Sequence, residues 1–225
     1  MLPICIQPGT NSIVDGMKRA KERGTHNLYL EEGVHIVTEK YVVLTGDWKI
    51  TGAGQDKTFV QGGFKMQGTK ETAGKRKKGK KKKSKKKKMK RVVLKDMTIK
   101  GSSANGLNGN DDDVSFLCDS ITITQCGEHG VYAENTKGRF INCVITQCER
   151  SGILCRGNCV VELEGNQTRI EGNVFGLHTI HTGSIIHLLF PLTKESVSTN
   201  NQSGNYVGDG EDNNSGTIET ISSFE

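Results

Sequence analysis

The sequence predicts an all-β protein: a right-handed single-stranded parallel β-helix (a β-solenoid) of about 22–24 residues per coil, with an N-terminal capping α-helix. Three observations predict this class. Short segments recur at a fixed interval, apolar and polar residues alternate within them, and glycine is abundant (28) while proline (3) and tryptophan (1) are scarce. A narrow coil buries only alternate residues, which suits a chain that is 33% hydrophobic.

The repeat is clearest in the middle of the chain. Ile123-Thr-Gln-Cys126 recurs as Ile145-Thr-Gln-Cys148, 22 residues later, and the same interval relates Gly130 to Gly152. Stacked coils about 4.8 Å apart are expected to share one core, because no single coil can bury its own inner face. Four coils are predicted to begin near Val92, Val114, Lys137 and Cys159.

The interval also predicts which side chains lie over one another on adjacent coils. Thr124 is expected over Thr146, and Glu134 over Arg156, where the opposite charges should pair. The arginine is therefore predicted to be structural.

The N-terminal part predicts a helix followed by strands. Residues 12–23 form an amphipathic pattern, which Asn11 or Ser12 can cap and Gly24 can end. Strands are expected at 27–30, 33–36, 41–44, 48–52, 58–61 and 64–67, each with β-type alternation.

This opening resembles that of pectin-lyase-like β-helix proteins. The shared features are the helix, the Leu28-Tyr-Leu30 and Gly33-Val34 strands, Ile50-Thr-Gly-Ala-Gly54 and the turn at Gly62-Gly63, and the resemblance covers roughly residues 5–190. It implies that the helix plugs the open end of the coil. It also implies either a polysaccharide lyase or glycoside hydrolase, or one of the non-catalytic members of that superfamily.

The catalytic pattern of such enzymes is matched poorly. Asp111, Asp112, Asp113 and His129 are weak catalytic candidates, because carboxylates and an imidazole are the groups that such chemistry uses. No cofactor is predicted, and calcium is expected only if the protein is a lyase, since the three carboxylates are oxygen ligands. The alternative is a polar turn and a structural histidine. No metal site is predicted, and the cysteines are expected to be buried thiols.

A lysine-rich turn insertion is predicted at about residues 68–91. Residues 75–91 hold 14 of the 31 Lys and Arg residues, so the rest of the chain carries a net charge of −8. The insertion lacks aromatic residues, so any nucleic-acid contact would be made to phosphate. It either binds polyanions or is a low-complexity expansion without a role. The candidate polyanion-binding residues are Lys80, Lys81, Lys82, Lys83, Lys85, Lys86, Lys87 and Lys88.

The chain is divided into a β-helix domain at 1–190 and a polar, partly disordered C-terminal tail at 191–225, with a possible last strand at 217–221. No membrane-spanning segment and no signal peptide are evident, which favours an intracellular protein, cytoplasmic or nuclear.

The leading functional hypothesis is a non-catalytic scaffold that presents a side face to a protein or a polysaccharide. The first alternative is a polysaccharide lyase or hydrolase of the pectin-lyase type. The second is polyanion binding through the lysine-rich insertion. The sequence does not indicate an oligomeric state.

Overall fold

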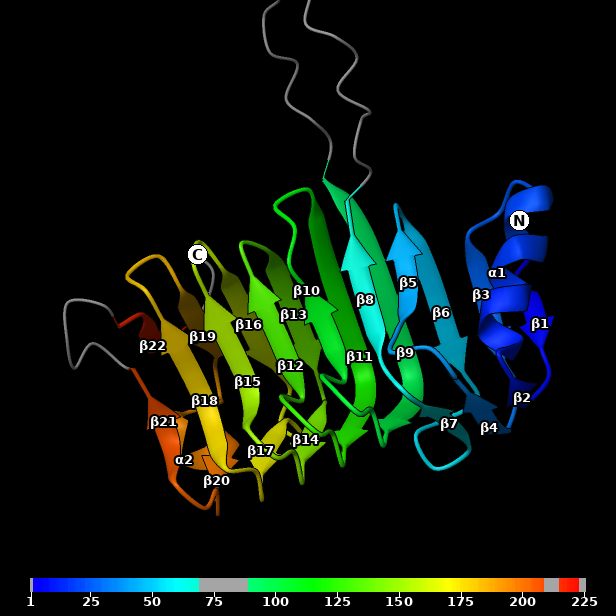
Figure 1. Cartoon of the computed structure of the whole chain (residues 1–225). Coiled ribbons are helices and arrows are strands. Elements are labelled where there is room, and N and C mark those ends of the chain that lie inside the picture. Colours follow the sequence, from blue (N-terminus) through cyan, green and yellow to red (C-terminus); the bar gives the residue numbers. More distant parts are fainter. Residues whose placement is uncertain (1, 69–88, 209–214, 223–225) are drawn as a thin grey trace, which may run out of the picture.

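The chain folds into a parallel β-helix, described here from a computed structural model that covers residues 2–68, 89–208 and 215–222 (Figure 1). Every pair of neighbouring strands is parallel, in a 15-stranded sheet (sheet A) and a 7-stranded sheet (sheet B). The predicted fold class is therefore confirmed, and the coils fit the right-handed form.

Sheet A has two arms, which we call the main face and the side arm. The main face contains β1 (Ile4–Ile6), β3 (Asn27–Leu30), β6 (Trp48–Gly52), β9 (Lys90–Lys100), β11 (Val114–Thr124), β13 (Lys137–Ile141), β16 (Val160–Glu164), β19 (Ile185–Leu189) and β22 (Thr217–Ile221). The side arm contains β2 (Gly9–Thr10), β4 (Gly33–Ile36), β7 (Thr58–Gln61), β14 (Val144–Thr146), β17 (Arg169–Glu171) and β20 (Ser198–Thr199). The long strands β9 and β11 run through both arms and bend at Asp96 and Ser120, which both have positive φ.

Sheet B closes each coil. It contains β5 (Val42–Thr45), β8 (Phe64–Gln67), β10 (Leu107–Gly109), β12 (Val131–Glu134), β15 (Ser151–Arg156), β18 (Phe175–Ile180) and β21 (Gly204–Val207). In Figure 1 these strands lie in front of the main face, and their order follows the chain from β5 to β21.

The core is a set of stacked aliphatic rows. Ile123 pairs with Ile145, which pairs with Ile170, and all three side chains are fully buried. Glycines form a row at the corner before sheet B, where side chains of the side arm fill the interior. A Cβ on Gly130 would lie 2.4 Å from the Cγ2 of Ile145, so this corner requires glycine.

The predicted register is correct for the central coils and wrong for the coil before them. Thr124 pairs with Thr146 and Glu134 with Arg156, each 22 residues apart, as predicted. However, Val114 pairs with Lys90 rather than Val92, because this coil has 24 residues. The turn at residues 110–113 is longer than its successors, and no repeated motif marks the difference.

The capping helix α1 (Ser12–Glu22) lies where the sequence predicts it and packs against β1 and β3. Ile13, Met17 and Ala20 are buried on its inner side, and Gly24 follows its end with a positive φ. The expected side-chain cap is absent, since Asn11 bonds to Thr38 instead.

The β-helix extends past residue 190, where the sequence analysis ended it. After helix α2 (Lys194–Val197), β20, β21 and β22 pair with β17, β18 and β19 and form a last coil, and the strand predicted at 217–221 is present. The Asn201 side chain replaces missing apolar contacts by donating to the carbonyls of Ile170 and Thr199. Residues 209–214 and 223–225 of the predicted tail lie outside the described residues.

In the described ranges, no helix has the length and apolar character needed to cross a membrane.

Candidate functional site

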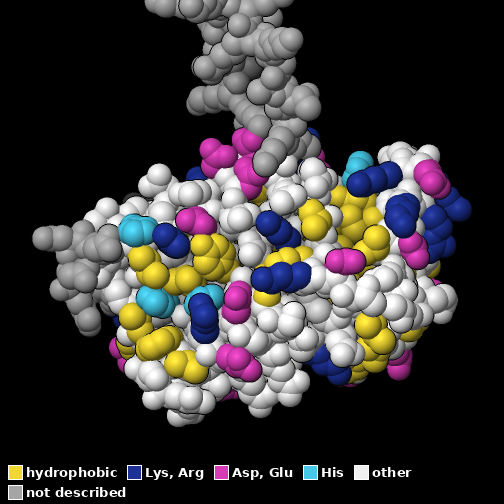
Figure 2. All heavy atoms as spheres, in the orientation of Figure 1, with side chains coloured by type: hydrophobic (Ala, Val, Ile, Leu, Met, Phe, Trp, Pro, Cys, Tyr) yellow, Lys and Arg dark blue, Asp and Glu magenta, His cyan; other side chains and the backbone are white. Residues whose placement is uncertain are grey.

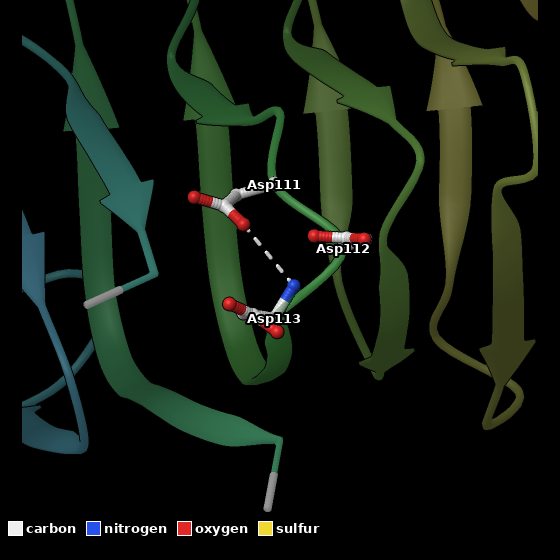
Figure 3. A group of neighbouring side chains, drawn as sticks. All are labelled: Asp111, Asp112 and Asp113. Carbon is white, nitrogen blue, oxygen red and sulfur yellow. Dashed lines mark hydrogen bonds between the residues drawn. The ribbon is translucent and has the colours of Figure 1, made fainter. Parts of the chain in front are cut away.

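The three aspartates predicted as catalytic candidates lie together on the turn between β10 and β11 (Figure 3). Each offers a carboxylate oxygen within 4.8 Å of the other two. One oxygen of Asp111 accepts the Asp113 N–H at 3.1 Å, and its second oxygen accepts the Gly68 N–H at 3.0 Å. Asp112 is exposed.

This turn holds both roots of the lysine-rich insertion. Gly68 is bound by Asp111, and the N–H of Lys90 donates to the carbonyl of Asp113 at 2.8 Å. Asp47 accepts the N–H of Arg91 at 2.8 Å and pairs with the Lys90 ammonium at 3.3 Å. The geometry therefore gives Asp111 a structural role. The lysines from Lys80 to Lys88 lie outside the described residues.

The aspartate turn does not fit calcium. Calcium takes six to eight oxygen ligands, and both carboxylate oxygens of Asp111 already accept backbone N–H groups. All three carboxylates also come from one turn, so they approach an ion from one side only.

His129, the fourth catalytic candidate, lies in a buried hydrogen-bond ladder at the corner before sheet B. Its N–H donates to the side-chain oxygen of Asn105, and its Nδ1 accepts the N–H of Ser151, both at 3.1 Å. The Ser151 hydroxyl lies 3.2 Å from Nδ1 of His178. Burial, with Arg150 and His178 nearby, lowers the pKa of His129 to about 4. The ring is therefore neutral at pH 7.

The four predicted residues do not form one constellation. The N–H of His129 bonds to the side chain of Asn105, which precedes Asp111 by six residues at the other end of the same strand region. Six residues of extended chain span roughly 20 Å. The aspartates and the imidazole therefore cannot act on the same bond.

Sheet B carries most of the remaining ionisable groups as internal pairs. The Tyr132 hydroxyl donates to Glu134 at 2.8 Å, and Arg156 lies 3.6 Å from the same carboxylate. Figure 2 shows this outer surface, with histidine, basic and hydrophobic side chains side by side over β15 and β18. These contacts satisfy the charged groups without leaving a hollow between them. The six cysteines of the coils are buried free thiols, as expected.

A groove on the main face of sheet A was not predicted. It has a volume of about 290 Å³ and is lined mainly by Arg91, Ser115, Lys137, Arg139, Val160 and Glu162. Arg91, Ser115 and Lys137 are in-register partners on β9, β11 and β13, so they form one row across three coils. Lys137 also lines a second hollow of about 410 Å³ beside the aspartate turn.

The groove is positively charged. Arg139 is neutralised by Glu162 at 3.5 Å and Glu164 at 2.7 Å. Arg91 and Lys137 are exposed, and within residues 2–68, 89–208 and 215–222 neither side chain has an ion-pair partner. Arg91 and Lys137 are 46 residues apart, the sum of one 24-residue and one 22-residue step. A uniform 22-residue interval places them out of register, which is why sequence analysis missed the row.

Comparison with known proteins gives little beyond the fold. No family model matches the sequence, and no curated protein matches it significantly. Among solved structures, the chain is similar to the A-module of mannuronan C-5 epimerase AlgE4 from Azotobacter vinelandii, at 13% identity and a TM-score of 0.41. The match covers 84% of this chain and 79% of that one.

Proposed function

We propose that this protein is a non-catalytic β-helix scaffold that binds an acidic polysaccharide in the groove of the main face. The observation that carries the proposal is the row formed by Arg91, Ser115 and Lys137. It presents two unpaired cations on either side of a hydroxyl, two coil steps or about 10 Å apart.

A repeating acidic ligand matches this row better than a single small anion. Guanidinium and ammonium groups are strong donors to carboxylate and sulfate oxygens. Because the two cations are separated by two coils, they suit charges that recur along a chain. The groove is also open along the row, so a polymer can enter without a conformational change.

The absence of a catalytic arrangement around the groove supports a binding role. The Ser115 hydroxyl donates to the carbonyl of Lys90 at 3.3 Å, and its neighbours in the groove are cationic. Within the described chain, the nearest main-face imidazole is His187, which lies beside Glu219 at 3.2 Å and two coils from Arg139. Ser115 therefore has no base to activate it.

The test is oligogalacturonate binding by titration calorimetry on the full-length chain, with the eight lysines at 80–83 and 85–88 changed to glutamine. These changes remove nonspecific capture by the insertion. We expect the R91A/K137A double variant to bind at least about tenfold more weakly, a loss of about 1.4 kcal/mol. The matched control is K57A/K65A, which removes two cations outside the groove.

Equal affinities for the two double variants would refute the groove. The same samples should be assayed for new chain ends and unsaturated products, since turnover would overturn the non-catalytic role and favour the lyase or hydrolase alternative. Binding that disappears with the eight lysines alone would assign polyanion binding to the insertion instead.

A further inference from the structure

The cations of the main face continue beyond the groove toward the capping helix. Lys49 on β6 is exposed and lies in the row that continues through Val93 and Leu117 to Arg139. Lys21 on α1 is also exposed, and its ammonium lies 5.9 Å from the centre of the Trp48 ring beside Lys49. Figure 2 shows basic side chains gathered at the end of the molecule formed by α1.

The acidic residues of the main face lie on the opposite side of the groove. β16 carries Glu162 and Glu164, and β22 carries Glu219. The in-register row therefore changes from Lys49 and Arg139 to Glu162, His187 and Glu219. A polyanion is attracted to one half of this face and repelled by the other.

The surface between Lys49 and Arg139 suits a sugar chain. Val93 and Leu117 point outward there and are half-buried, so they provide a low apolar floor with cations at both ends. Sugar rings have apolar C–H faces as well as charged substituents, and such a floor can contact them. The three coil steps from β6 to β13 span about 14 Å.

We infer that the bound polysaccharide runs along the solenoid axis from the groove to the helix-capped end, over Val93 and Leu117, and reaches Lys49 and Lys21. Glu162 and Glu164 limit it on the other side. This inference rests on the proposed function and adds a direction and a minimum length. The ligand is a linear acidic chain of several sugar units, bound by its length rather than at one residue.

The test compares galacturonate oligomers of different length on the full-length chain with the same eight lysine changes. We expect the K21A/K49A double variant to bind a hexasaccharide about tenfold more weakly than the parent protein, from about fivefold or less per exposed cation, and a disaccharide equally well. The matched control is K57A/K65A, which should alter neither affinity. R91A/K137A should weaken both oligomers, because every bound chain occupies the groove.

These outcomes separate the two proposals. If K21A/K49A binds the hexasaccharide like the parent while R91A/K137A has lost affinity, the extended track is wrong and the groove stands. If K21A/K49A weakens the disaccharide as much as the hexasaccharide, the track is also wrong, because short chains then do not stay in the groove. If R91A/K137A has no effect on either oligomer, the groove itself is refuted.

Discussion

His129 is held as a neutral imidazole by its neighbours on adjacent coils. Its Nδ1 accepts the Ser151 N–H, so a proton cannot bind that nitrogen without breaking the bond. Arg150 and His178 disfavour positive charge nearby, and burial also lowers the pKa of His178. The corner is therefore a place where acid should act on the fold.

Lowering the pH should destabilise the protein through His129. The pKa in the folded state is about 4, below the ordinary value of 6.5, so the unfolded chain binds more protons between these two values. Stability attributable to this group should be present above about pH 6.5 and fall by about 1–3 kcal/mol as the pH drops to 4. Urea unfolding of wild type and H129Q at several pH values measures this. Parallel pH profiles for the two proteins would contradict it.

Gly130 should tolerate no side chain. Alanine there would place Cβ 2.4 Å from Ile145 and 2.7 Å from the carbonyl oxygen of Gly152, so two coils would have to separate. We expect G130A to lower the free energy of unfolding by about 1–3 kcal/mol. T122A, which trims an outward side chain of β11, should change it by less than about 0.5 kcal/mol. Equal urea midpoints would show that the corner is not tightly packed.

At the scale of elements, the turn between β10 and β11 fastens the lysine-rich insertion to the solenoid. Its two roots bond to different groups of this single turn, one to the Asp111 carboxylate and the other to the Asp113 carbonyl. The neighbouring Asp112 is exposed on the same turn, so the turn contains its own control.

D111A should therefore destabilise the fold while D112A should not. Removing the Asp111 carboxylate leaves the N–H groups of Gly68 and Asp113 without that acceptor, a cost of about 1–3 kcal/mol. D112A should stay within about 0.5 kcal/mol of wild type. Thermal or urea unfolding of the two variants decides between a structural and a purely surface role. A larger loss in D112A would reverse the assignment.

The elements were largely predictable because each coil repeats its own pattern. Alternation located the strands, and the Ile-Thr-Gln-Cys motif fixed the register of β11 and β14. The coil between β9 and β11 was mispredicted, since its extra residues lie in a turn without apolar periodicity. The last coil was missed because Asn201 satisfies backbone groups where the earlier coils use buried aliphatic side chains.

The groove could not be predicted for a related reason. A row across coils depends on the length of every intervening turn, and an error of two residues returns the side chain to the same face but moves it along the strand. Arg91 also looks like part of the lysine run until β9 is seen to begin at Lys90. The aspartate cluster needed no such alignment, since its members are adjacent in sequence.

For the whole molecule, the solenoid separates charge along its length. The chain outside residues 75–91 has a net charge of −8, yet Lys21, Lys49, Arg91 and Lys137 lie toward the N-terminal end of one face. An average charge therefore hides a polar arrangement. The proposed ligand would be oriented by this arrangement before it makes any close contact.

The way the insertion is attached has a consequence for how this family of shapes can vary. Gly68 and Lys90 are anchored across one turn, so the coils on either side already have their register without the residues between them. Lengthening such a segment adds only a slowly growing entropic cost. The position is thus a docking port in the engineering sense, where foreign peptides could be displayed or exchanged while the rod beneath keeps its shape.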